Sequence, residues 1–228
     1  MSPTQKTQHC CSPADGISST SAMQSTRELI VEPIGLDVET LARPIDWQTL
    51  FGNDHPVEME IGTGKGTFLT DQARARPETN FFGIEYARWF WRYASDRLRR
   101  NHCLNARMVR AEASFFLREF VPNASLSVLH IYFPDPWPKK RHHKRRLIQK
   151  PFTAEILRVL AANGRVQIVT DHGDYFEQIE QVIADSALKP IEYNRPGSVA
   201  EGEFVGTNFE RKYRRDGRPF HAIAAIKA

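Results

Sequence analysis

Short apolar runs alternate with amphipathic stretches along the chain from Val57 onward. This alternation is typical of strands that each lead into a helix, and repeated strand-helix units build a mostly parallel sheet with helices on both faces. We therefore expect an α/β fold. The runs expected to form strands are residues 57–61, 81–85, 106–110, 127–133, 165–170 and 220–226.

Two helices are expected between these strands. Residues 87–101 carry apolar side chains at helical spacing and several arginines elsewhere, which predicts an amphipathic helix whose four aromatic residues pack against its neighbours. Residues 152–160 are expected to form a helix that stops at Asn163-Gly164, a common C-terminal signal. Residues 190–206, with Pro and Gly at intervals, are expected to leave the sheet before the last strand.

The length and composition favour one domain without a membrane segment. A chain of 228 residues with 41% hydrophobic residues can bury one sizeable core, which we expect within residues 27–228. Residues 1–26 are rich in Ser, Thr and Gln and are predicted to be a disordered tail. No stretch approaches the roughly 18 consecutive apolar residues of a membrane span, and the N-terminus lacks the order of a signal peptide. Three cysteines without disulfide or zinc spacing favour the cytoplasm and no metal site.

A glycine-rich loop, residues 60–66, directly follows the first of these strands and leads into a helix. Small residues there let the backbone approach a ligand, and open sheets bind ligands at the carboxyl ends of their strands. A phosphate-binding P-loop is disfavoured because Met59 stands where its first glycine belongs. The dinucleotide pattern fails at its third glycine, which is Thr67, and Glu60 would repel a pyrophosphate. A nicotinamide dinucleotide is therefore the second choice.

Acids at three successive strand ends favour a cationic ligand without phosphate, such as S-adenosylmethionine. Glu60 offers a counter-charge for its amino acid end. Glu85 stands where a carboxylate can accept hydrogen bonds from ribose hydroxyls, although that role is shared with dinucleotide sites. Glu112 could reach an adenine amino group. Each acid taken alone could equally be a helix N-cap, but the recurrence of all three favours the ligand.

The most specific stretch reads Phe-Pro-Asp-Pro-Trp-Pro at residues 133–138 and follows the fourth strand. Its three prolines make it rigid, so that Asp135 and Trp137 are held in place. Residues 139–146 then carry six Lys or Arg and two His without a break, which favours an RNA backbone by counterion release. The alternative is a solvated basic loop.

Guanine N7 is a chemically suitable acceptor for this arrangement. It exposes a lone pair and carries no proton, so that no strong general base is required. Asp135 would accept hydrogen bonds from the guanine N1 and N2 edge, and Trp137 would either stack on a base or pack in the loop. Residues 207–210, Thr-Asn-Phe-Glu, could read a guanine edge and precede a second basic cluster, with a plain surface turn as the alternative.

Several motifs together resemble the bacterial tRNA (guanine-N7-)-methyltransferase family over roughly residues 57–228. The two most specific are Pro-Asp-Pro-Trp-Pro-Lys-Lys at residues 134–140 and Thr-Asn-Phe-Glu at residues 207–210. The glycine loop, Gly-Ile-Glu at residues 83–85 and Thr-Asp at residues 170–171 agree with them. The resemblance implies a class I S-adenosylmethionine-dependent methyltransferase, with a Rossmann-like, mostly parallel seven-stranded sheet and helices on both faces.

The resemblance also implies a reaction and a set of residues. The reaction is methylation at N7 of the guanosine at position 46, in the variable loop of tRNA, with S-adenosylhomocysteine as product, no metal and no membrane partner, by a monomer or homodimer. The cofactor-binding positions are Glu60, Gly62, Gly64, Glu85, Glu112 and Asp135, and Asp135 is also the catalytic residue. The substrate-binding positions are Lys139, Asp171, Thr207, Asn208, Phe209 and Glu210. Glu112 departs from the family, which more often has Asp there.

Three other functions stay open at this point. The first is a methyltransferase acting on rRNA or on a small molecule, although the basic runs disfavour a small substrate. The second is a non-catalytic RNA-binding protein on a similar fold, which the intact acids and glycines disfavour. The third is a dinucleotide-dependent oxidoreductase, which the missing third glycine and the absence of an obvious Tyr-Lys pair disfavour.

Overall fold

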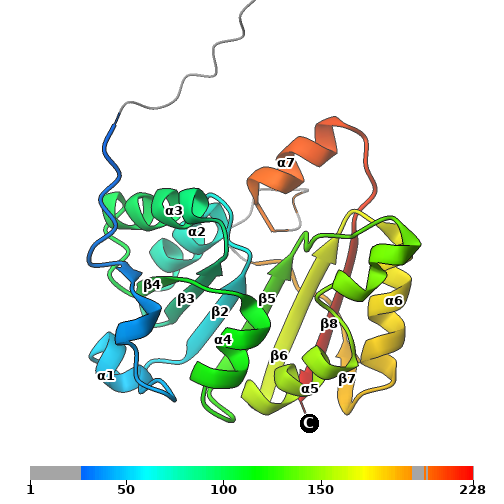
Figure 1. Cartoon of the computed structure of the whole chain (residues 1–228), viewed down its shortest axis with the longest axis horizontal. Coiled ribbons are helices and arrows are strands. Elements are labelled where there is room, and N and C mark those ends of the chain that lie inside the picture. The colour runs from blue at the N-terminus through cyan, green and yellow to red at the C-terminus, as the bar shows by residue number, and fades with distance from the viewer. Residues whose placement is uncertain (1–26, 197–202, 204, 228) are drawn as a thin grey trace, which may run out of the picture.

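The computed structural model describes residues 27–196, 203 and 205–227, which form one mixed sheet covered by helices (Figure 1). The tail expected over residues 1–26 lies outside the described residues. The strands are β1 (Gly35–Leu36), β2 (Val57–Ile61), β3 (Asn80–Glu85), β4 (Ala106–Arg110), β5 (Leu126–Tyr132), β6 (Leu160–Thr170), β7 (Leu188–Ile191) and β8 (His221–Lys227). The α-helices are α1 (Trp47–Phe51), α2 (Thr67–Ala75), α3 (Arg88–Arg100), α4 (Ala113–Phe120), α5 (Lys150–Val159), α6 (Gly173–Ala184) and α7 (Asn208–Arg215).

The sheet confirms the expected mostly parallel α/β fold. Within the described part of the chain it has eight strands in the order β1-β4-β3-β2-β5-β6-β8-β7. The first six strands of this order run parallel, and β8 runs antiparallel between β6 and β7. The expected count of seven is exceeded by β1, a two-residue edge strand that pairs with β4. The parallel order places the carboxyl ends of β2, β3, β4 and β5 along one edge of the sheet.

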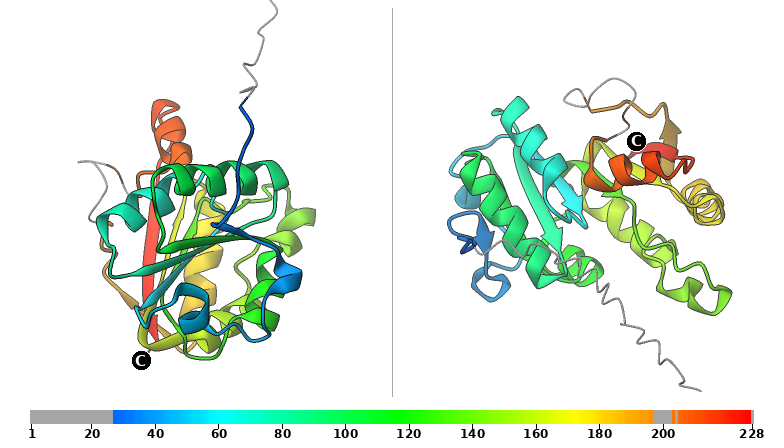
Figure 2. Two further views of the ribbon diagram at one scale, coloured as in Figure 1. Left: turned by 90° about the vertical axis from the view of Figure 1, so that its left-hand side faces the viewer. Right: turned by 90° about the horizontal axis from the view of Figure 1, so that it is seen from above.

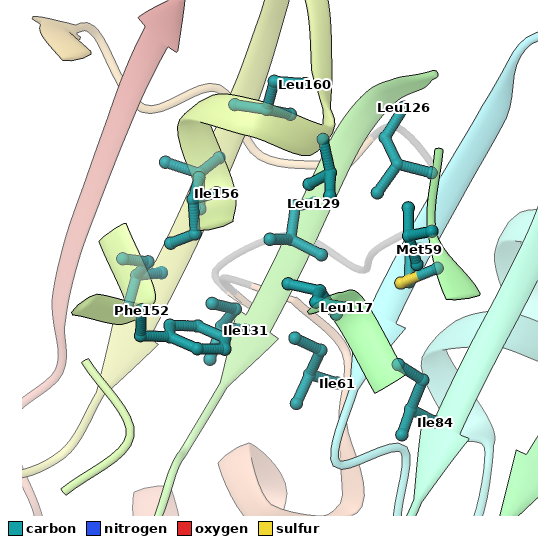
Figure 3. Packing of buried hydrophobic residues seen from close by; sticks show 14 of the residues in the cluster. Met59, Ile61, Ile84, Leu117, Leu126, Leu129, Ile131, Phe152, Ile156 and Leu160 are labelled. Carbon is teal, nitrogen blue, oxygen red and sulfur yellow. The ribbon is translucent and has the colours of Figure 1, made fainter. Parts of the chain in front are cut away.

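Helices cover both faces of this sheet (Figure 2). On one face α4, α5 and α6 bury side chains such as Leu117, Ile156 and Tyr175 against the central strands. Figure 3 shows Leu117 and Ile156 from these helices beside Leu129 and Ile131 of β5. On the other face α2 and α3 pack a second cluster around β3 and β4. No helix among the described residues is long and apolar enough to cross a lipid bilayer.

The strand predictions for residues 57–61 and 106–110 match β2 and β4 in both bounds, the one for β3 starts one residue late, and those for β5 and β8 are displaced by one residue at both ends. The prediction for the start of β6 is wrong. The helix α5 already ends at Val159, and Leu160 pairs with Leu126 of β5. The pairing then shifts, so that Asn163, at a φ of 61°, lies in an irregularity of the strand rather than at a helix end.

The helix predicted over residues 87–101 is α3, shorter by one residue at each end. Its aromatic residues were expected to pack internally. Trp91 does so, against the cluster between α3 and the sheet, whereas Trp89 is 55% exposed. Farther along, the segment expected to leave the sheet over residues 190–206 does so only after β7, which ends at Ile191; residues 197–202 and 204 lie outside the described residues.

Gly83, at the centre of β3, lets α2 lie directly on the sheet. A Cβ at this position would come within 2.5 Å of Leu69 Cδ1 on α2 and 2.9 Å of Thr63 Cγ2 in the glycine loop, and it would also overlap Met108 Sδ. These are distances that a real Cβ does not tolerate without movement of its neighbours. The missing side chain therefore sets how close α2 and the glycine loop lie to the sheet.

Candidate active site

The glycine loop crosses the carboxyl ends of the central strands between β2 and α2. Its three glycines, Gly62, Gly64 and Gly66, have φ values of 77°, 53° and 67°, in the left-handed region that side chains rarely adopt. Two cavities border the loop, one of about 520 Å³ and one of about 410 Å³. Gly62 and Gly64 line the larger cavity, and Gly62 also lines the smaller one; that they bind a cofactor stays a prediction.

Glu60, at the end of β2, lines the smaller cavity and is 2% exposed. Its Oε2 atom and the neighbouring Thr63 Oγ1 are buried without a hydrogen-bond partner among the described residues. Burial, together with the nearby Glu85 carboxylate, raises the pKa of the Glu60 carboxyl to about 8. A buried acid with an unsatisfied oxygen is suited to a cationic group that donates hydrogen bonds.

Glu85, at the end of β3, lines the larger cavity. Its carboxylate accepts a hydrogen bond from the Gly64 amide at 2.8 Å through Oε2 and one from the Ala87 amide at 2.9 Å through Oε1. Each oxygen keeps a lone pair beyond the one it uses here. The two amides hold the carboxylate in one orientation at the cavity wall, where it can accept hydrogen bonds from a pair of ligand hydroxyls.

Glu112, after β4, also lines the larger cavity, but its carboxylate serves the helix that follows. It accepts hydrogen bonds from the Ser114 amide at 2.9 Å and the Phe115 amide at 2.7 Å, and so forms the N-cap of α4. The predicted contact with an adenine amino group would have to use the remaining lone pairs of this capping carboxylate.

Asp135 lies exposed at the edge of the larger cavity, in the loop that follows β5. It makes no hydrogen bond or ion pair with any residue that the structure describes. On either side of it, Phe133 and Trp137 have positive φ values of 52° and 44°. Such backbone conformations are costly for non-glycine residues and persist where the surroundings impose them. The loop therefore presents a free carboxylate from a fixed backbone.

Arg146 fixes this loop from behind. Although it belongs to the basic run, it is only 2% exposed. Its guanidinium donates to the Pro136 carbonyl at 2.8 Å, to Gln178 Oε1 at 2.8 Å and to Asp174 Oδ2 at 2.6 Å. The last two residues belong to α6, so that Arg146 joins the Asp135 loop to a helix packed on the sheet.

The rest of the basic run lies at the surface. Residues 140–145 form a short 3-10 helix with Lys139 as its N-cap. The Arg145 guanidinium lies 5.0 Å from the centroid of the Trp137 ring, which lines the larger cavity. The exposed cations of the run are Lys139, Lys140, Arg141, Lys144 and Arg145. Lys139 therefore lies beside the site without lining either cavity.

Asp171 follows β6 and lines neither cavity. Its carboxylate accepts a hydrogen bond of 2.7 Å from the Arg218 guanidinium. This ion pair joins the end of β6 to the segment between α7 and β8. The structure therefore places Asp171 near the predicted substrate side without bringing it to the cavity wall.

The Thr-Asn-Phe-Glu motif forms the start of α7, and its four residues divide into two pairs. The Thr207 hydroxyl accepts from the Glu210 amide at 3.0 Å, and the fully buried Glu210 carboxylate accepts from the Val205 and Gly206 amides at 2.8 and 2.9 Å. Glu210 thus holds the helix start and lines neither cavity. Asn208 and Phe209, which lie between them, line the smaller cavity, as Thr207 also does, and Phe209 lines the larger cavity too.

Several wall residues were not predicted from the sequence. Phe90 of α3 and Tyr132 of β5 line both cavities, and Lys65 lines the smaller one. The helical spacing of Phe90 gave no sign of this, because a cavity wall and a packed core require the same apolar residue. Lys65 could have been noted as the one cation inside the glycine loop.

Buried polar side chains form a continuous hydrogen-bonded series from Tyr132 of β5 to Glu58 of β2. The Tyr132 hydroxyl lies 2.7 Å from His130 Nδ1, and His130 Nε2 lies 2.9 Å from Glu58 Oε2. Arg76 donates two hydrogen bonds to Glu58, at 2.7 and 2.8 Å. Glu58 is therefore fully paired, in contrast to Glu60 two residues later on the same face of β2.

Across the described segments of the chain, no group of three or more His, Cys, Asp and Glu residues could hold a metal ion. The acids Glu60 and Glu85 at the cavity walls are suited to an organic ligand with a cationic end and hydroxyl groups, and the smaller cavity is also lined by Lys65, Arg211, Lys212 and Arg215. The two buried acids stand at different cavities, Glu60 at the smaller and Glu85 at the larger.

Known proteins of similar structure share this architecture. The fold matches a 30S ribosomal A1408 methyltransferase from an uncultured bacterium with a TM-score of 0.55 and 16% identity, over 79% of this chain and 91% of the other. It matches the 16S rRNA methyltransferase KamB with a TM-score of 0.56 and 14% identity, over the same shares of the two chains. These similarities establish the class I methyltransferase fold.

Similarity in sequence is more specific. Residues 54–223 match the family model described as a putative methyltransferase. The tRNA (guanine-N(7)-)-methyltransferase of Rhodopirellula baltica is 38% identical over 83% of this chain and 72% of its own. The enzymes of the same name from Alkalilimnicola ehrlichii and Geobacillus thermodenitrificans are 34% and 35% identical, over 87% and 82% of this chain and 84% and 86% of their own. The chain belongs to the tRNA (guanine-N(7)-)-methyltransferase family.

Proposed function

We propose that the protein transfers a methyl group from S-adenosylmethionine to N7 of the guanosine at position 46, in the variable loop of tRNA. The observation that carries this proposal is the placement of the free Asp135 carboxylate between an acid-lined cavity and an exposed basic run. The names of the relatives support the reaction and the RNA class. The cytoplasm as its location, and a monomer or homodimer as its form, stay predictions.

The acids of the two cavities fit the cofactor. Glu60, with its unsatisfied buried oxygen, would receive the ammonium of the amino acid end. Glu85, held by two amides, would accept the ribose hydroxyls, and Glu112 would lie on the adenine side of the larger cavity. When bound, S-adenosylmethionine supplies a methyl group on a positively charged sulfur. The acids Glu60 and Glu85 at these positions favour this ligand over a dinucleotide, whose pyrophosphate they would repel.

Asp135 positions the guanine. Its carboxylate, free of partners within the described chain, can accept hydrogen bonds from the guanine N1–H and N2 amino group on one edge of the base. N7 carries no proton, so that the protein has only to align its lone pair and exclude competing orientations. Methylation leaves a positive charge on the base, which the negative charge of Asp135 stabilises as it develops.

The fixed loop backbone lowers the free-energy cost of this alignment. Phe133 and Trp137 hold their positive φ values before the substrate binds, and Arg146 ties Pro136 to α6. The carboxylate therefore needs little reorganisation at the moment of reaction, which is the condition under which a charged group contributes most to catalysis.

The substrate-binding residues act at different distances from the base. Lys139 and its exposed neighbours are placed to contact phosphates, and Asn208 and Phe209 are placed at the cavity wall. Glu210 supports the substrate indirectly, by holding the start of α7, whereas Thr207 both caps this helix and lines the smaller cavity. Asp171 acts through its ion pair with Arg218.

The test is incubation of the protein with labelled S-adenosylmethionine and total tRNA from a strain that lacks this modification, followed by identification of the modified nucleoside. We expect 7-methylguanosine, mapped by sequencing to position 46. The Asp135→Asn variant is the matched control, because it keeps the size of the side chain and removes its charge. No label in tRNA, or label on another atom of the base, would contradict the proposal.

A further inference from the structure

A row of four aromatic side chains, two exposed and two half-buried, lies along the first half of α3 and just before it. Trp89 is 55% exposed and stacks on Tyr93, with the ring centroids 5.2 Å apart and the planes at 23°. Phe90 meets Trp89 edge-on with the centroids 5.1 Å apart, and Lys65 Nζ lies 5.9 Å from the Tyr93 centroid. We call Tyr86, Trp89, Phe90 and Tyr93 the α3 aromatic face.

The α3 aromatic face begins inside the proposed active site and continues outward. Phe90 lines both cavities and Tyr86, 70% exposed, lines the larger one. Trp89 lines neither cavity, and Tyr93 lies one turn farther along the helix. In Figure 1, α3 and α7 both lie along the side of the sheet where the parallel strands end. The row therefore leads from the cavity onto a surface beside it.

The charges around this face are positive. Arg88 and Lys65 are exposed and make no ion pair with the described residues. The single acid of α3, Asp96, is buried and is already paired with Arg27, Arg99 and Arg100. The surface that Trp89 and Tyr93 present is therefore apolar rings next to cations, with no carboxylate from α3 among them.

We propose that the α3 aromatic face binds unpaired bases of the RNA that neighbour the target guanosine, by stacking. This inference rests on the proposed function. A base that enters an enzyme cavity leaves its stack, so that its neighbours lose a stacking partner. Exposed aromatic rings replace that partner for any base, and adjacent cations neutralise the backbone between bases. A row that starts at the cavity wall lies where those neighbours must pass.

The test compares Trp89→Ala with Leu104→Ala, which removes a 69% exposed apolar side chain beyond the end of α3. The dissociation constant for unmodified tRNA is measured at several salt concentrations. We expect Trp89→Ala to weaken binding about tenfold, since one stacked base is lost, and Leu104→Ala to leave it unchanged. Trp89→Phe keeps a ring and should recover most of the affinity.

Two further measurements separate stacking from phosphate contacts and from a change in cofactor binding. A stacked ring releases no counterion, so that the slope of affinity against salt should be the same in Trp89→Ala as in the unaltered protein, whereas Arg88→Ala should reduce it by about one phosphate contact. The affinity for S-adenosylmethionine should not change in Trp89→Ala, because Trp89 lines neither cavity.

Each other outcome overturns the inference. If Trp89→Ala binds tRNA as tightly as the unaltered protein while that protein methylates tRNA normally, the stacking inference is wrong and the proposed function stands. If the unaltered protein neither binds nor methylates tRNA, the proposed function fails first and the inference with it. If sedimentation shows that Trp89→Ala splits a dimer into monomers, the face joins two copies of the chain instead.

Discussion

Glu58 and Glu60 lie on the same face of β2, both are buried, and their carboxyl groups are shifted in opposite directions. Burial, together with the nearby Glu85 carboxylate, raises the pKa of Glu60 to about 8, from an ordinary value of 4.5. Burial also opposes ionisation of Glu58, but hydrogen bonds from His130 and Arg76 outweigh it and lower the pKa to about 2. We predict that replacing each by glutamine changes stability with opposite sign.

The magnitude for Glu60 follows from the two pKa values. Between pH 4.5 and 8 the unfolded chain ionises this carboxyl and the folded chain does not, which favours unfolding by about 1.4 kcal/mol per pH unit. The cost is absent below pH 4.5, reaches about 3 kcal/mol at pH 7 and stops growing above about pH 8. Glu60→Gln removes it, so that the ligand-free variant should be more stable at pH 7 by up to about 3 kcal/mol.

Glu58 shows the reverse dependence. Its lowered pKa contributes stability that is fully present above pH 4.5 and is lost as the pH falls through about 2. Glu58→Gln should therefore lose about 3 kcal/mol at pH 7, and the unpaired partners left behind add to the loss. The two variants differ by two positions on one strand and share the same chemical change, which makes each the control for the other.

Urea denaturation of both variants at pH 5 and pH 7 measures these differences. The advantage of Glu60→Gln should fall below about 1 kcal/mol at pH 5, because the unfolded chain is then only partly ionised. Calorimetry should show that the same variant binds S-adenosylmethionine much more weakly, since the carboxyl that would ionise beside the bound ammonium is gone. A Glu60→Gln protein that is less stable than the unaltered one at pH 7, or whose advantage does not shrink at pH 5, would refute the reasoning.

Three further predictions concern the loop after β5. Asp135→Ala should abolish methyl transfer to tRNA while changing the free energy of unfolding by less than about 0.5 kcal/mol, because the side chain is exposed and unpaired within the described chain; normal turnover would exclude it from the reaction. Replacing Lys139 and Lys140 by alanine should reduce the salt slope of tRNA binding by about two, and an unchanged slope would show that neither contacts a phosphate. Arg146→Ala should lose about 2 kcal/mol of stability and slow the methyl-transfer step in single-turnover assays without altering that slope, whereas a reduced slope would mean that it contacts RNA.

Much of the fold follows from patterns that extend over several residues. Both ends of β2 and β4 are predicted correctly because each strand is a short run with buried apolar residues at its centre, although Arg107 and Arg110 of β4 are not buried. β1 was missed because two residues cannot show a pattern. β7 was missed because Pro190 and a largely exposed side at the sheet edge remove the alternation that marks a strand. The Asn-Gly pair in β6 was misread because a left-handed residue can end a helix or bend a strand.

The roles of the site residues, too, are only partly predictable from the sequence. The sequence locates the acids at strand ends, and Glu60 and Glu85 do line the cavities. It does not distinguish an acid that faces a ligand from one that caps a helix, because both stand just before a helix. Glu112 caps α4 while lining a cavity, and Glu210 supports α7 without reaching one. Only the three-dimensional structure separates these roles.

Because Gly83 has no side chain, a substitution there should make the protein temperature-sensitive. Gly83→Ala would force the side chains of Met108, Leu69 and Thr63 to move, at a cost of roughly 1 to 3 kcal/mol. Part of this cost falls on α2 and on the glycine loop that borders both cavities. On warming, the variant should therefore lose its cofactor before it unfolds globally. Cells carrying that allele should lose the modification at high growth temperature and regain it on cooling, although the substitution touches no ligand.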